Sequence, residues 1–174
     1  AAMDPLSFAV YPYAAPNAVE RMYHYLWRFW QNVPAPGEIS IFDRTWYGRV
    51  MVERIEKLTP DVDWRRGYAE INEMEKQWSE ANMVLAKFWL QIDQEEQARR
   101  FKDREENPEK EWKITEEDWR NRAKWSDYEA AVNEMIARTN TDYAPWIIVE
   151  ANSKYYARLK VLETVIDLLE KKLK

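Results

Sequence analysis

Four short apolar runs, separated by segments with helical spacing, constrain the fold of this chain most. The runs are FAVYPY, EISIF, MVLAKFWLQI and WIIVEA. Each has the length of a strand, and the segments between them repeat apolar residues three or four positions apart, which is typical of amphipathic helices. Strands that alternate with helices form βαβ units, whose strands lie parallel. We therefore predict an α/β fold, with a parallel sheet and helices on both faces.

The ends of these elements follow from strand length and from helix caps. We predict that the strands end near Val10, Asp43, Leu90 and Glu150. Several segments of helical spacing begin at a serine, threonine, asparagine or aspartate that can cap a helix, some with a glutamate three residues later. We predict helices at about 17–31, 48–58, 60–80, 93–106, 115–125, 126–138 and 154–174. In the last helix, we expect one apolar face to pack on the sheet, formed by Leu159, Leu162, Val165, Ile166, Leu169 and Leu173.

Length and composition exclude several classes of protein. A chain of 174 residues is the size of one domain, so we predict a single domain over 1–174. The absence of cysteine excludes disulfides and thiolate metal sites, and a net charge of -5 argues against a nucleic-acid partner. We find no apolar run long enough for a membrane helix and no signal peptide, so we expect no membrane partner and a cytoplasmic location. We interpret residues 1–7 as a leftover of cloning or a disordered start.

An acid and a base directly follow the second apolar run. Asp43 and Arg44 come after EISIF, at the carboxyl end of the predicted strand, where ligands bind in parallel sheets. An acid at the end of a buried strand is the Walker B arrangement, in which the carboxylate holds Mg²⁺. The alternative is that Asp43 only caps the helix that follows.

The usual companion of a Walker B acid does not occur in the sequence. P-loop enzymes hold phosphates with the Walker A loop, G-x-x-x-x-G-K-[ST], whose backbone amides and lysine surround the anion. The chain has 3 glycines, Gly37, Gly48 and Gly67, and lysine follows none of them.

Longer stretches resemble a known family. The segments YHYLWRFWQNVPAPGEISIFDRTWYGRVMVERIE, AKFWLQIDQEEQARRFKDRE and WIIVEANSKYYARLKVLETV are similar to the polyphosphate kinase 2 family, and within it to the polyphosphate:AMP phosphotransferases. The resemblance runs from about Tyr11 to Val165. It implies a P-loop kinase-like fold, a helical lid, and Mg²⁺-dependent transfer of phosphate between polyphosphate and a nucleotide, AMP or ADP.

The resemblance assigns roles to individual residues. In the family pattern F-D-R-S-W-Y-G-R, the Walker B aspartate matches Asp43, and the two arginines match Arg44 and Arg49; Thr45 replaces the serine. The lid pattern R-F-x-x-R matches its second arginine to Arg104. We therefore predict that Asp43 binds the metal and that Arg44, Arg49 and Arg104 are catalytic and hold phosphates.

One part of the family pattern has no counterpart in these residues. The family's first strand, Walker A loop and first helix would precede FAVYPY, and that strand lies in the middle of the sheet. We expect a partial domain that is inactive alone. It is then a piece of a longer enzyme, a partner of a complementing N-terminal fragment, or a non-catalytic, homo-oligomeric remnant that still binds anions. The remaining alternative is that the resemblance is misleading and that the chain is a helix-rich interaction protein.

The segment 99–125 is the predicted lid. It carries about as many basic as acidic residues, so the positions of the bases matter more than their number. Arg100 and Arg104 share a helix face, as do Arg120 and Lys124, with Arg122 between the latter two. We predict that these side chains bind the phosphates of the substrate. The alternative is a solvated helix with ion pairs four residues apart.

Other candidates are interpreted as structural. The 10 tryptophans are expected to pack, although Trp112, Trp119 and Trp125 in the lid could instead stack a nucleobase. His24 shows no partner in the sequence that would make it a general base. Glu53 lies four residues after Arg49, so we predict an ion pair between them.

Overall fold

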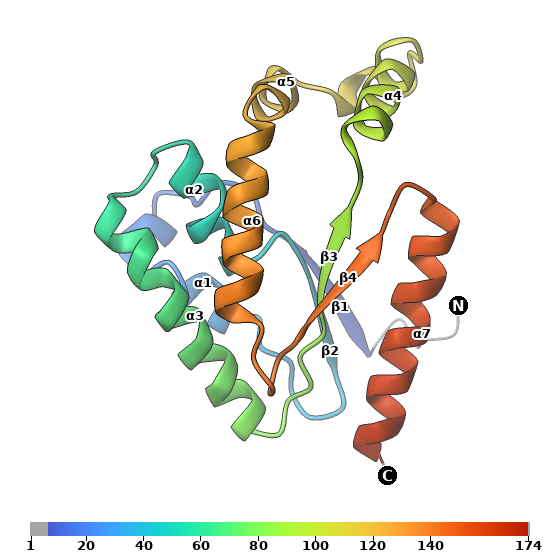
Figure 1. Ribbon diagram of the computed structural model, residues 1–174. Helices are drawn as coiled ribbons and strands as arrows, with labels where there is room; N and C mark the ends of the chain where they lie inside the picture. Colours follow the sequence, from blue (N-terminus) through green and yellow to red (C-terminus); the bar gives the residue numbers. More distant parts are fainter. Residues whose placement is uncertain (1–6, 174) are drawn as a thin grey trace. The chain divides into compact units, whose positions relative to one another are not determined.

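The computed structural model describes residues 7–173 (Figure 1). Its contacts divide the chain into two compact units, residues 1–67 and 68–174, and each is described by itself. The predicted single domain stays a prediction. Residues 1–6 lie outside the described part, whereas the Ser7 carbonyl accepts a hydrogen bond from the Ile39 amide at 2.9 Å. Ser7 therefore extends the strand pairing.

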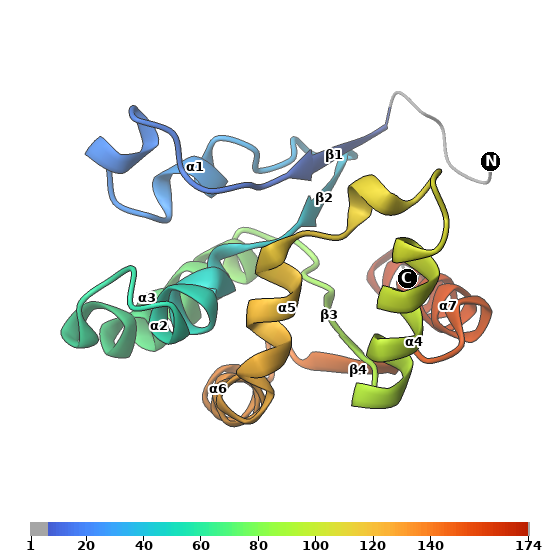
Figure 2. The same cartoon turned by 90° about the horizontal axis from the view of Figure 1, so that it is seen from above.

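The first unit is built on a parallel pair of strands. Its elements are β1 (Phe8–Pro12), the 3₁₀ helix η1 (Glu20–Met22), α1 (Trp27–Trp30), β2 (Ile39–Asp43), the 3₁₀ helix η2 (Trp46–Val50), α2 (Val52–Ile55) and the start of α3 (Asp61–Glu80). Phe8 pairs with Ile39 and Pro12 with Asp43, so the two strands end together (Figure 2). A proline at the end of β1 costs little, because β1 has β2 as its one partner strand among the described residues.

Aromatic side chains form the core on one face of this pair. Phe42 of β2 lies edge-on to Trp46, with ring centroids 5.5 Å apart, and Phe29 of α1 meets the same indole at 5.5 Å. Both Phe29 and Trp46 are buried. On the opposite face, Val10 and Ile41, which pair in register, stay 54% and 43% exposed. The pair of strands is thus covered on one side in this unit.

The helix predicted over 17–31 is wrong as a continuous element. The predicted cap forms: the Asn17 side chain accepts a hydrogen bond from the Glu20 amide at 2.9 Å, and the Glu20 side chain accepts one from the Asn17 amide at 2.7 Å. Only η1 follows, because Tyr23 is extended with φ -114° and ψ 167°. The Leu26 amide then donates to His24 Nδ1 at 3.4 Å, just before α1 begins. The predicted helix at 48–58 likewise divides, into η2 and α2.

The second unit contains another parallel pair and most of the helices. Its elements after α3 are β3 (Lys87–Gln91), α4 (Gln94–Glu105), the 3₁₀ helix η3 (Glu111–Lys113), α5 (Glu116–Ala123), α6 (Trp125–Thr139), β4 (Trp146–Glu150) and α7 (Lys154–Leu173). Lys87 pairs with Trp146 and Gln91 with Glu150. Helix starts match the predicted caps at Asp93, whose side chain accepts from the Glu96 amide, and at Thr115, which forms a capping box with Asp118.

One face of this pair is held by a buried ion pair. Lys87 Nζ lies 2.8 Å from Glu75 Oε2 of α3 and donates to the Thr139 carbonyl of α6, also at 2.8 Å. The two side chains are 5% and 0% exposed. Burial lowers the pKa of the Lys87 ammonium from its usual value, although Glu75 opposes that shift. The bond network therefore joins β3, α3 and α6.

Helix α7 covers the other face, but not with the side chains predicted. Ala157 of α7 is buried with Val149 and Ala151, and Val161 packs against them, as Figure 1 shows for α7 beside β4. The predicted apolar face instead points largely to solvent: Leu159 is 59% and Leu162 57% exposed. The side of α7 that packs on the strands is therefore the one that carries Ala157 and Val161.

The predicted α/β class with parallel strands is confirmed. All four strands end within two residues of the predicted ends, and they pair as two two-stranded parallel sheets. Helices cover both faces in the second unit. Among residues 7–173, no helix is both long and apolar enough to span a membrane.

Candidate functional site

The turn after β2 presents Asp43 and Arg44 to solvent. Asp43 is the last residue of the strand, and its backbone carbonyl accepts a hydrogen bond from the Tyr13 amide at 2.9 Å. Its side chain is exposed and takes no part in the strand pairing. Arg44 has φ +63°, a left-handed conformation that costs an ordinary residue about 1–2 kcal/mol. Thr45 caps η2 by accepting from the Tyr47 amide, so the alternative that Asp43 is the cap is wrong. Strain of this kind concentrates at functional sites.

Asp43 fits a magnesium ion as a single carboxylate ligand. No group of three or more histidine, aspartate or glutamate side chains that could hold a metal occurs within residues 7–173. Magnesium is commonly held by one or two carboxylates, with water and substrate phosphates completing its octahedron. Asp43 is one such carboxylate, and magnesium at this position stays a prediction.

Arg49 is held rigidly on η2. Its Nη1 lies 2.9 Å from Glu53 Oε2, as predicted, and donates to Thr59 Oγ1 at 2.6 Å. The guanidinium carbon lies 4.2 Å from the centroid of the Tyr25 ring. Its buried Nε has no hydrogen-bond partner in the described part of the chain. Gly67 of α3 makes room for the arginine stem, because a Cβ there would lie 2.8 Å from Arg49 Cγ.

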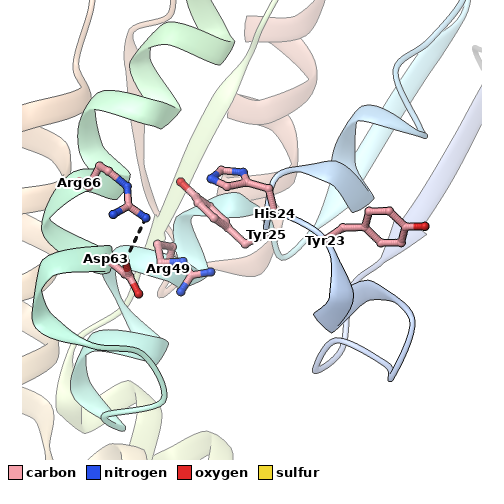
Figure 3. A pocket seen from close by; sticks show the side chains of 6 residues that line it. All are labelled: Tyr23, His24, Tyr25, Arg49, Asp63 and Arg66. Carbon is pink, nitrogen blue, oxygen red and sulfur yellow. Dashed lines mark ion pairs between the residues drawn. The ribbon is translucent and has the colours of Figure 1, made fainter.

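A cavity of about 150 Å³ lies beside Arg49 in the first unit. The residues that line it are Tyr23, His24, Tyr25, Arg49, Asp63 and Arg66. Figure 3 shows Arg49, Asp63 and Arg66 on one side of the Tyr25 ring and His24 on the other, whereas the Tyr23 ring points away from them. Arg66 Nη2 and Asp63 Oδ1 form an ion pair of 2.9 Å at its wall. The cavity therefore combines aromatic faces with paired charges.

In the second unit, Arg100 ties the predicted lid to the end of β4. Its Nε lies 2.6 Å from Glu96 Oε1, and its Nη2 donates to the carbonyls of Ala151 at 2.5 Å and Asn152 at 3.2 Å. Hydrogen bonds to Arg99 and Arg100 lower the pKa of Glu96 to about 2. Asn152 also donates to Asp93 at 2.6 Å. These contacts join the carboxyl ends of β3 and β4.

The other predicted lid bases lie on α4, α5 and the junction that follows. Arg104 donates to the Lys113 carbonyl at 3.3 Å, and Arg122 to Gln94 and Gln97 at 2.9 and 2.8 Å. Arg120 is exposed on α5, and Lys124 separates α5 from α6. Their roles toward substrate stay predictions.

The lid tryptophans divide between packing and exposure. Trp119 lies edge-on to Phe101, with ring centroids 4.9 Å apart, so it packs within the lid. Trp112 is 75% exposed, and its indole donates to the Glu109 carbonyl.

Sequence reasoning missed Tyr25, Asp63 and Arg66. No motif marks them, and Tyr25 was expected on a helix. The break in that helix brings Tyr25 to Arg49, and the glycine at 67 permits the approach of α3. Gly67 was the one available signal, as an isolated glycine inside a helical pattern, which often marks close packing.

Comparison with known proteins decides the family. The family model described as polyphosphate kinase 2 matches residues 1–174. The chain belongs to the polyphosphate kinase 2 family. A Pseudomonas syringae pv. tomato protein named polyphosphate:AMP phosphotransferase is 55% identical over 171 residues, which are 98% of this chain and 34% of that protein. The AMP/ADP-polyphosphate phosphotransferase of Meiothermus ruber is 35% identical, over 97% of this chain and 63% of its own length.

A solved polyphosphate kinase 2 structure has the same fold. It comes from Pseudomonas aeruginosa PA01, has 53% sequence identity and superposes with a TM-score of 0.96 over 98% of this chain and 37% of its own. The P-loop kinase-like fold prediction is thereby confirmed. The present chain spans about a third of the length of the Pseudomonas syringae protein.

Proposed function

We propose that this polyphosphate kinase 2 chain supplies the Walker B carboxylate, phosphate-binding arginines and lid of an enzyme that transfers phosphate between polyphosphate and AMP. The observation that supports this most is the turn after β2, where Asp43 is exposed beside a strained Arg44. The choice of AMP follows the name of the relative that is 55% identical.

The proposed division of work follows from the side chains. Asp43 would hold Mg²⁺, which neutralises phosphate oxygens as charge develops between donor and acceptor. Arg44 is exposed and follows directly, so it can contact the same phosphates. Arg49 is already oriented by Glu53 and Thr59 and would lose little entropy on binding. Arg104 would bind phosphate from the lid.

The 174 residues alone are proposed to transfer little or no phosphate. They contain no Walker A sequence, so the backbone amides and lysine that position phosphate would be absent from the polypeptide. Loss of one comparable donor costs about 10²–10³ in rate, and here several are missing together.

Complementation tests this function. The chain is incubated with polyphosphate, Mg²⁺ and AMP, alone and with a second polypeptide that carries a strand, a G-x-D-x-x-G-K-G loop and a helix. We expect ADP to form only in the mixture, and Asp43→Asn to abolish it. Thr45→Ser, which keeps the capping hydroxyl, is the matched control and should retain activity. Turnover by the chain alone at the level of the mixture would refute the proposal.

A non-catalytic, self-associating chain is the second candidate. The exposed Val10 and Ile41 on the open face of β1 and β2 favour it, because such surface is usually covered. A second copy of the chain would cover it in a homo-oligomer. Sedimentation at micromolar concentration should then show a dimer or larger species that Val10→Lys dissociates; a monomer would exclude this candidate.

A further inference from the structure

We propose that the outer face of α7 is a dimer interface, at which α7 of one copy of this chain pairs in parallel with α7 of a second copy. This surface is distinct from the open face of β1 and β2. The proposal goes beyond the proposed function, because it does not depend on phosphate transfer.

Helix α7 carries a second apolar stripe, on the side opposite to the one that packs. Ala157 and Val161 pack on the strands, whereas large apolar side chains line the other side. We call this line the α7 seam; it consists of Tyr155, Leu159, Leu162, Ile166, Leu169 and Leu173. Leu169 is partly buried, and the other five are 54–86% exposed. Exposed apolar surface of this kind commonly marks a protein–protein contact.

The spacing of the α7 seam is that of a two-stranded coiled coil. The intervals between its residues alternate strictly between four and three positions, which is a repeat of 3.5 residues. Leu159, Ile166 and Leu173 then occupy position a of the heptad, and Tyr155, Leu162 and Leu169 occupy position d. A β-branched residue at a, between leucines at d, favours pairing with a single helix. The sequence around Ile166 has this arrangement.

The charges beside the seam favour a second copy in parallel orientation. Arg158 lies at position g and Glu163 at position e. In a parallel pair, g of one helix faces the e position five residues later on its partner, so Arg158 would meet Glu163 of the second copy, twice by symmetry. In an antiparallel pair, g faces g and e faces e. Arg158 would then approach Lys172 of the second copy, and the two Glu163 side chains would approach each other.

The helix is already formed before it pairs. An isolated helix of this length is only marginally stable in water, so forming it usually opposes the pairing of a short coiled coil. Here Val149 and Ala151 hold the inner face of α7 through Ala157. The seam therefore lies on a helix that the rest of the chain has ordered.

Sedimentation of the 174-residue chain tests the interface. We expect an equilibrium between monomer and dimer at micromolar concentration. Leu162→Glu places a carboxylate from each copy in the seam and should raise the dissociation constant at least about tenfold. Leu162 is exposed in the single chain, so circular dichroism should show an unchanged fold. A chain that stays monomeric, or a dimer that Leu162→Glu leaves intact, would overturn the proposal.

Exchange of the flanking charges tests the orientation. Arg158→Glu and Glu163→Arg should each weaken the homodimer about tenfold at low salt, because each places like charges together twice. An equal mixture of the two variants should form a heterodimer at least as tight as the parent, because opposite charges then face each other. The matched control is Asp167→Arg, an exposed charge change outside the seam and its flanks, which should have no effect. A stronger homodimer of Arg158→Glu would indicate the antiparallel pair and would overturn the proposal.

The polypeptide with the Walker A loop distinguishes a different occupant. If the chain alone is monomeric and Leu162→Glu abolishes binding of that polypeptide, the seam belongs to it and the dimer fails. If the mixture forms ADP while the chain alone stays monomeric, the dimer fails and the proposed function stands. If the chain dimerises through the seam and the mixture forms no ADP, the proposed function fails and the dimer stands.

Discussion

Replacing Gly67 by alanine is expected to destabilise the first unit, although alanine is the better helix former. Gly67 lies inside α3, where alanine should gain about 1 kcal/mol from helix propensity alone. The added Cβ, however, would lie 2.8 Å from Arg49 Cγ and 3.3 Å from Val50 Cγ1. Carbon atoms in contact prefer about 3.5–4.0 Å, so the arginine stem must move by about 1 Å.

The arginine stem cannot move without loss of its contacts. Arg49 is anchored by Glu53, by Thr59 at 2.6 Å and by the Tyr25 ring. Overpacking of this kind costs about 1–3 kcal/mol. Subtracting the gain in propensity leaves a net loss of about 0–2 kcal/mol, and we expect about 1 kcal/mol.

Gly48→Ala is the matched control. No atom lies within 4 Å of a Cβ built at Gly48, so this substitution should be neutral or stabilise by up to about 1 kcal/mol. Hydrogen exchange of the amides of residues 46–67, followed by mass spectrometry across a urea series, measures the opening of this unit separately from residues 68–174. Gly67→Ala should lower the free energy of opening of this unit, whereas Gly48→Ala should leave it unchanged or raise it.

A double variant isolates the clash. In an Arg49→Ala background the obstructing stem is gone, so Gly67→Ala should stabilise by about 1 kcal/mol, which is a coupling of roughly 2 kcal/mol between the sites. A single Gly67→Ala variant that is more stable than the parent, or an unchanged effect in the double variant, would refute the view that Arg49 is fixed against α3.

Three further outcomes are expected. Lys87→Met leaves the buried Glu75 carboxylate without its cation and should lower the free energy of unfolding of residues 68–174, measured in urea, by about 3–5 kcal/mol. Adding Glu75→Leu should reduce that loss; an equal loss in the single and double variants would contradict this. The pKa of Glu96 in the folded protein, about 2, lies below its ordinary value of 4.5. The contribution of Glu96 to folding stability is therefore complete above pH 4.5 and is lost as the pH falls from 4.5 to about 2; a titration midpoint of its carboxyl NMR signal at 4.5 would contradict this. Arg44→Gly should stabilise by about 0.5–1 kcal/mol and Arg44→Ala should not, because only glycine relieves φ +63°.

Local patterns predicted the strands and several caps because those signals are contained within a few residues. The run EISIF ends at Asp43 in the structure, as expected, and Asp93 caps α4 through the Glu96 amide. Such features depend on apolar alternation and on hydrogen bonds across three residues, which can be read directly from a sequence.

Features that depend on tertiary packing could not be predicted in this way. A continuous helix over 17–31 satisfies the local pattern, but Tyr23 is extended, and Tyr25 instead contacts Arg49. The cavity exists because of that break, so its lining residues could not be identified from helical spacing. For α7, the larger leucines predicted one packing face, whereas the buried face is the one that carries Ala157 and Val161.

The buried Lys87 also makes the second unit suitable for chemical measurement of its opening. Amine-reactive reagents can reach Lys102, whose side chain is 72% exposed, without any change in the fold. Lys87 is 5% exposed and its ammonium is held by Glu75 and Thr139, so acylation at this position requires β3 to separate from α3 and α6. The ratio of labelling at these two lysines, followed over time by peptide mapping, would therefore report how often residues 68–174 open under native conditions.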